Sequence, residues 1–147
     1  MTVRQSIALA LLLLLPALSA SAQLQVGADR MDEIVRLTEG RSVGLVANQA
    51  AVQTDSVHTF LLDALIDHEV KVKRLFSPEH GFRAMADAGA KVDSATDPVS
   101  GLPVISLYGK HRKPTAKDFA GLDVILFDLQ DVGVRFFTYI STLYYVM

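Results

Sequence analysis

The sequence predicts an α/β protein in which a parallel sheet carries helices on both faces. Two observations support this prediction. Short apolar runs of strand length alternate along the chain with amphipathic segments of helix length. The apolar runs also lack the polar alternation of a half-exposed strand, as is typical of parallel strands buried on both faces. A repeated strand–helix order favours a parallel sheet with crossover helices.

The first half of the chain predicts two helix–strand pairs. The helix expected over 29–38 has apolar residues at helical spacing, with Asp29 as a cap and Gly40 after its end. The run 42–47 is short and apolar, so we expect a buried strand there. A second helix is expected over 59–67 and a second strand over 70–76, which the pair Ser77-Pro78 ends.

The second half continues the same alternation after an interruption. Residues 84–100 show little periodicity, and we expect an irregular surface segment there. A strand is then expected over 102–108, a short helix over 114–120, the most apolar strand over 122–129, and a last helix over 136–147.

The N-terminus has the pattern of a secretion signal. Arg4 precedes an apolar run over 7–15, Pro16 interrupts that run, and 20–22 reads Ala-Ser-Ala. A membrane anchor is the alternative, but a span needs about 20 apolar residues. We therefore expect a signal peptide over 1–22, a mature domain over 23–147 without a stable membrane anchor, and a secreted or periplasmic protein.

Composition excludes several classes of protein. The 147 residues carry 14 Lys and Arg against 16 Asp and Glu, a formal net charge of −2, which argues against a nucleic-acid binder. The absence of Cys excludes a disulfide scaffold, a thiolate metal site and a cysteine nucleophile. No glycine-rich dinucleotide or phosphate-binding motif is present, so no cofactor is expected.

Polar residues follow each of the predicted strands, and the carboxyl ends of parallel strands share one rim of a sheet. This rim collects carboxylates, amides, a histidine and two cations; the candidate site residues are Asn48, Glu79, His80, Arg83, Asp128, Gln130, Asp131 and Arg135. Turns are polar in any protein, so ordinary turn chemistry is the alternative for each residue.

Individual residues carry both interpretations. Glu79 follows Pro78 and precedes the flexible turn at Gly81, which suits a general acid, or it could simply pair with Arg83. Asp128 ends an apolar strand and needs a hydrogen bond or a cation, for which Arg135 is the nearest candidate.

Alternative roles are also considered for Asn48, for Asp131 and for a metal site. Asn48 suits a sugar hydroxyl but also a bridge between two loops, and a turn or capping role is favoured for Asp131. A metal site could draw only on residues without a recognised ligand spacing, namely His58, His80, His111, Glu79, Asp87 and Asp93, so no metal is expected.

Several motifs together resemble one known family. They include Val-Gly-Leu-Val-Ala-Asn-Gln at 43–49, Ser-Pro-Glu-His-Gly-Phe-Arg at 77–83, Ser-Leu-Tyr-Gly at 106–109, and Asp-Leu-Gln-Asp-Val-Gly-Val-Arg at 128–135. In this order they are similar to the NamZ-type exo-β-N-acetylmuramidases, glycoside hydrolase family 171. The sequence departs from the pattern at Ala84, where the family usually has Gly.

The resemblance implies a Rossmann-like N-terminal domain, a second domain that completes the active-site cleft, and an enzyme that releases N-acetylmuramic acid from non-reducing ends of peptidoglycan fragments. It implies that Glu79 is the catalytic acid/base, while Asn48, His80, Asp128, Asp131 and Arg135 bind substrate or support the site. Arg83 or Arg135 could bind the lactyl carboxylate of the sugar, and Gln130 a ring hydroxyl.

Two alternatives to an active muramidase remain open. The chain could be a muropeptide-binding module without catalysis. It could also be an inactive fragment, because the expected last helix, 136–147, reaches the last residue of the sequence and the expected second domain is missing.

Overall fold

A computed structural model describes residues 24–79, 81–83, 95–134 and 136–147. The predicted signal peptide, most of the segment 84–100, and the candidates His80 and Arg135 lie outside the described residues. Within the described residues, no helix is both long enough and apolar enough to cross a membrane.

A five-stranded sheet forms the centre of the structure, with strand order β3-β4-β2-β1-β5. Four strands are parallel, and β3 pairs antiparallel with β4. The strands are β1 (Val43–Ala47), β2 (Val72–Ser77), β3 (Ala95–Thr96), β4 (Pro103–Ser106) and β5 (Val124–Asp128).

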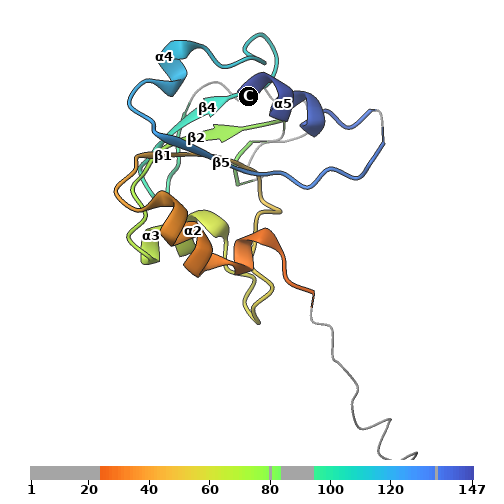
Figure 1. The fold of residues 1–147 in the computed structure, drawn as a ribbon. Helices are drawn as coiled ribbons and strands as arrows, with labels where there is room; N and C mark the ends of the chain where they lie inside the picture. Colours follow the sequence, from red (N-terminus) through yellow and green to blue (C-terminus); the bar gives the residue numbers. More distant parts are fainter. Residues whose placement is uncertain (1–23, 80, 84–94, 135) are drawn as a thin grey trace, which may run out of the picture.

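Helices cover both faces of this sheet, as predicted (Figure 1). The 3-10 turn η2 (Gly27–Asp29) leads into α2 (Met31–Thr38), and α2 lies beside α3 (Leu61–Asp67) on one face. The other face carries α4 (Ala116–Phe119) and α5 (Tyr139–Val146). The observed fold is therefore the α/β architecture that the sequence predicts.

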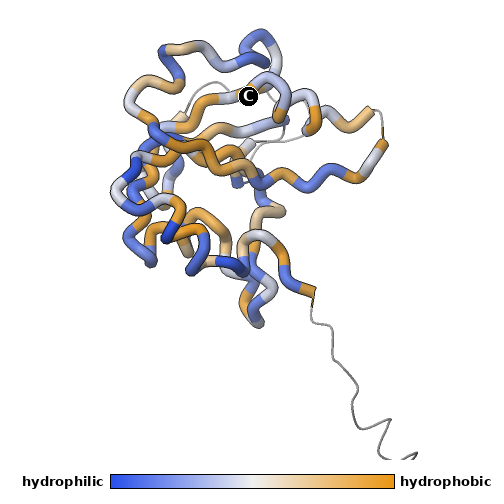
Figure 2. Tube along the Cα trace, viewed as in Figure 1, coloured by the Kyte–Doolittle hydropathy of each residue, from blue (hydrophilic) through white to orange (hydrophobic). Residues whose placement is uncertain are grey.

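Each face of the sheet has its own hydrophobic core, and Figure 2 shows the apolar residues concentrated along the strands. On the α2/α3 face, Leu45 and Leu75 pack with Leu62 and Leu65 of α3. The opposite core is smaller and is built around Phe76. Neighbouring residues of a strand point to opposite faces, which explains why Leu75 and Phe76 belong to different cores.

The structure corrects two details of the prediction. Asp29 does not cap α2: its carboxylate accepts the backbone N–H of Val26 and so closes the 3-10 turn that precedes the helix. The end of the segment 84–100 is not irregular, because Ala95 and Thr96 form the edge strand β3 and the next residue, Asp97, is buried. A two-residue strand is too short for hydrophobic periodicity to reveal.

Candidate functional site

Strands β2 and β4 end side by side at the carboxyl rim of the sheet. Ser77 and Ser106 are partners in the register of this parallel pair, and the N–H of Leu107 donates to the carbonyl of Ser77 at 2.7 Å. Glu79 lies two residues beyond Ser77, and Tyr108 lies two residues beyond Ser106. Both strands therefore end at the same height in the sheet, and Glu79 and Tyr108 each lie two residues beyond a paired serine.

Glu79 lies in a tight turn after β2. Pro78 is fully buried, and the N–H of Gly81 donates to its carbonyl at 3.3 Å. Gly81 has a φ of 82°, a conformation that costs glycine far less than other residues. The turn holds the half-buried Glu79 at the rim of β2, the middle strand of the sheet.

Tyr108 is a side chain at this rim to which the sequence analysis gave no role. The Glu79 carboxylate raises the pKa of the Tyr108 phenol, first through hydrogen bonding and then through its negative charge. The sequence places Tyr108 at the end of a predicted strand, but it does not reveal that this strand is the neighbour of β2. The order of strands in the sheet is the missing signal.

Arg83 braces the loop that contains Glu79. Its guanidinium contacts Asp63 and Asp97, each at 2.7 Å, and lies 4.7 Å from the centre of the Phe60 ring. These contacts raise the pKa of Arg83, with the Asp63 hydrogen bond as the largest cause. Among the described residues Arg83 forms no ion pair with Glu79, so the predicted Glu79–Arg83 alternative is wrong.

This bracing also bears on substrate binding. The positive charge of this guanidinium is already balanced by two carboxylates that also accept its hydrogen bonds. It is therefore poorly suited to bind the carboxylate of a sugar. The structure thus favours support of the loop by Arg83 over the carboxylate-binding role that the sequence analysis considered.

Asn48 bridges two segments at the end of β1. Its side chain is buried, its Oδ1 accepts the N–H of Ala50 at 3.0 Å, and its Nδ2 donates to the Tyr139 hydroxyl at 3.0 Å. Gln130, which follows β5, also contacts the loop after β1, because its Nε2 donates to the carbonyl of Ala50 at 3.1 Å. Of the two roles considered for Asn48, the structure shows a bridge, here between the loop after β1 and the first residue of α5.

The two candidate aspartates differ in environment. Asp128 is the last residue of β5, lies opposite Ala47 in the register, and is half-buried; burial raises the pKa of its carboxyl. Asp131 is exposed, and its Oδ1 accepts the N–H of Gly133 at 2.7 Å, which is the predicted turn role. The two strands β2 and β5 flank β1, so their ends lie about 10 Å apart.

Among the described residues no group of three His, Asp or Glu side chains could hold a metal ion. Of the residues considered for a metal, His111 contacts the carboxylate of Asp118 at 3.0 Å. His80, Asp87 and Asp93 lie outside the described residues.

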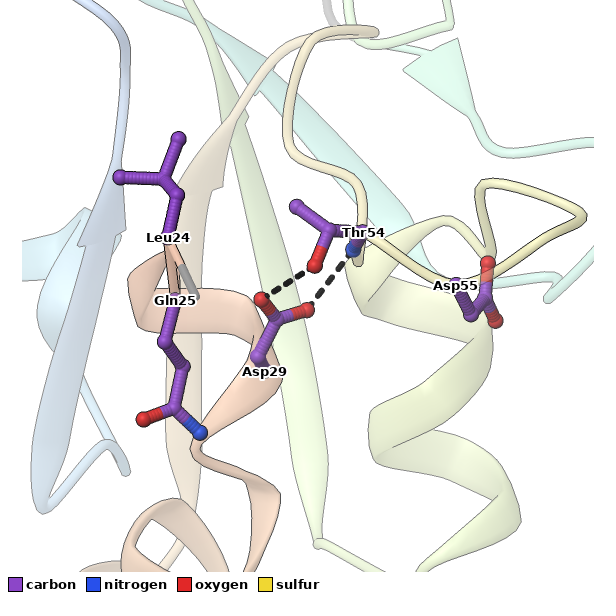
Figure 3. A pocket seen from close by; sticks show the side chains of 5 residues that line it. All are labelled: Leu24, Gln25, Asp29, Thr54 and Asp55. Atoms are coloured by element: carbon purple, nitrogen blue, oxygen red, sulfur yellow. Dashed lines mark hydrogen bonds between the residues drawn. The ribbon is translucent and has the colours of Figure 1, made fainter. Parts of the chain in front are cut away.

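A polar pocket lies between the segment 24–29 and the loop after β1 (Figure 3). Asp29 accepts hydrogen bonds from the backbone N–H and the hydroxyl of Thr54, each at 2.7 Å, and these bonds lower the pKa of Asp29. Asp55 accepts from Thr59 in the same way, which lowers its pKa. Asp29 therefore connects η2 with the loop after β1, whereas Asp55 closes its own loop.

The fold and the rim define an α/β protein with a glutamate-bearing site at the carboxyl ends of its parallel strands. A family model described as exo-β-N-acetylmuramidase NamZ, N-terminal, matches residues 43–147. The chain belongs to this family.

Individual relatives agree with this assignment. The chain is 41% identical over 127 residues to the peptidoglycan β-N-acetylmuramidase NamZ of Bacillus subtilis strain 168, covering 85% of this chain and 30% of the relative. Two crystal structures of DUF1343 family proteins from Bacteroides fragilis superpose with TM-scores of 0.72 and 0.70, at 38% and 27% identity. The superpositions cover 84% and 86% of this chain but 30% and 31% of those proteins.

Proposed function

We propose that this chain provides the catalytic acid of a glycosidase that releases N-acetylmuramic acid from the non-reducing ends of peptidoglycan fragments. The observation that carries the proposal is Glu79, which a buried proline and a hydrogen-bonded turn hold at the rim of the middle strand. Membership of the NamZ family and the 41% identity to a named peptidoglycan muramidase support the choice of substrate.

The chemistry that Glu79 would perform is general acid catalysis. Glycoside cleavage requires a proton on the leaving oxygen while positive charge develops at the sugar ring. A protonated Glu79 would supply that proton as the glycosidic C–O bond breaks. Asp128 is the better placed second carboxyl, because the Asp131 carboxylate is already occupied by the turn at Gly133.

The test is the isosteric variant Glu79→Gln in the full-length gene product. Loss of a general acid lowers the rate by about 10²- to 10⁴-fold. We expect a fall of this size in the release of N-acetylmuramic acid from a disaccharide in which it is the non-reducing sugar. Glu39→Gln is the matched control, because Glu39 is exposed beyond the end of α2, and it should retain full activity.

Two outcomes would contradict the proposal. Undiminished turnover by Glu79→Gln would remove Glu79 from the acid role. Binding of the disaccharide by the unsubstituted protein without any cleavage would instead support a sugar-binding module.

We also propose that residues 1–22 are a signal peptide and that the protein acts outside the cytoplasm, where its substrate is found. Arg4, the apolar run over 7–15 and the Ala-Ser-Ala sequence support this proposal. N-terminal sequencing of the exported protein should find Gln23 first. An intact N-terminus on a cytoplasmic product would contradict it.

A further inference from the structure

The strongest unexplained feature of the rim is the placement of Tyr108 beside Glu79. The register that pairs Ser77 with Ser106 fixes where each strand ends, and the 2.7 Å hydrogen bond from Leu107 to Ser77 extends the pairing one step further. Glu79 and Tyr108 therefore follow closely on a paired part of the sheet, Glu79 two residues after Ser77 and Tyr108 one residue after Leu107.

The hydroxyls of Ser77 and Ser106 form no hydrogen bond with Glu79. Leu75 and Val104 belong to the core on the α2/α3 face, and residues two further along a strand point to the same face. Ser77 and Ser106 therefore lie side by side on that face. Both hydroxyls are buried, and neither has a hydrogen-bond partner among the described residues.

Two other donor side chains among the site candidates are engaged elsewhere. Arg83 is held by Asp63 and Asp97, and Asn48 is held by Tyr139 and Ala50. Neither Arg83 nor Asn48 therefore competes with the Tyr108 phenol for the Glu79 carboxyl.

We propose that Tyr108 is a positioning residue that orients the carboxyl of Glu79 toward the glycosidic oxygen. The inference rests on the proposed function of Glu79. During cleavage the carboxyl proton passes to the leaving oxygen as the C–O bond breaks, and the phenol keeps its own proton and donates a hydrogen bond to the new carboxylate. The raised pKa of Tyr108 agrees with a phenol that stays protonated; Arg112 opposes this effect weakly through its charge.

The test compares two leaving groups in the full-length gene product. A sugar leaving group needs a proton, whereas 4-nitrophenolate leaves without one. We expect Tyr108→Phe to lower kcat for the disaccharide by about 10- to 100-fold, a part of what general acid catalysis supplies. On the 4-nitrophenyl β-glycoside of N-acetylmuramic acid its kcat should stay within about threefold of the unsubstituted protein.

Two controls separate positioning from a structural effect. Tyr144→Phe removes the hydroxyl of an exposed tyrosine on α5 and should leave both rates unchanged. Tyr108→Gln retains a hydrogen-bond donor and should keep more activity on the disaccharide than Tyr108→Phe.

The inference fails if Tyr108→Phe lowers both rates equally, or neither. The proposed function of Glu79 fails on a different result, namely a Glu79→Gln variant that retains activity on the disaccharide.

Discussion

The side-chain amide of Asn48 donates a hydrogen bond of 3.0 Å to the hydroxyl of Tyr139, 91 residues later in the chain. The bond connects the loop after β1 with the first residue of α5, and Asn48 is 3% exposed. Two distant parts of the rim are therefore held at a fixed separation, and the buried amide depends on both of its partners.

Removing the Asn48 side chain should destabilise the protein more than removing the Tyr139 hydroxyl. Asn48→Ala removes two hydrogen bonds from a buried position and should cost about 1–3 kcal/mol, whereas Tyr139→Phe should cost about 1 kcal/mol. Urea unfolding of both single variants and the double variant gives the coupling energy, expected at about 0.5–1.5 kcal/mol. Strictly additive effects would show that the bond contributes nothing to stability.

Arg83 should be far more important for stability than an exposed arginine. Its side chain is 18% exposed and pairs with Asp97, which is 1% exposed, so Arg83→Met leaves a buried carboxylate without its cation. We expect a loss of about 3 kcal/mol in the free energy of unfolding. Arg30→Met is the control, since Arg30 and Glu33 are both exposed, and it should change stability by less than about 0.5 kcal/mol.

The contribution of this ion pair should also depend on pH. Burial alone would raise the pKa of Asp97, but hydrogen bonds from Arg83 and Ser100 lower it overall. A carboxyl with a lowered pKa stabilises the folded state above its unfolded pKa, and this contribution is lost as pH falls through the folded value. The stability difference between the unsubstituted protein and Arg83→Met should therefore shrink under acid; a constant difference would contradict the role of charge.

Gly44 should tolerate no larger residue. A Cβ there would lie 2.7 Å from Cδ1 of Ile125 and 2.8 Å from Cδ1 of Leu122, inside the tightly packed region around β1. We expect Gly44→Ala to cost about 1–3 kcal/mol through overpacking. Gly27→Ala is the matched control, because a Cβ at Gly27 would meet nothing within 4 Å. Equal stability of the two variants would show that the neighbouring side chains can move aside.

Hydrophobic runs predicted the alternation of helices and strands in this molecule. The apolar run that became β1 is buried at all five positions, so its pattern was unambiguous. The bracing of Arg83 could not be predicted, because Asp63 and Asp97 lie in different segments that only the folded chain brings together. Tyr108 was given no role for a similar reason: its neighbour is set by the order of strands, which local sequence does not encode.

Asp128 should lower stability at neutral pH rather than raise it. Burial raises the pKa of its carboxyl, so the folded state favours the protonated form. Its stabilising contribution is present below the unfolded pKa and is lost as pH rises through the folded value. Asp128→Asn should therefore raise the melting temperature at pH 7, and the gain should disappear under acid.

Asp131→Asn is the control for this experiment, because Asp131 is exposed and asparagine can accept the same turn hydrogen bond from Gly133. Its melting temperature should stay unchanged at both pH values. A less stable Asp128→Asn variant at pH 7 would mean that a cation holds the carboxylate, for which Arg135 is the sequence candidate. The variant could instead be more stable but slower to release N-acetylmuramic acid. The unfavourable burial of Asp128 would then serve activity at the expense of stability, a trade-off that is common at functional sites.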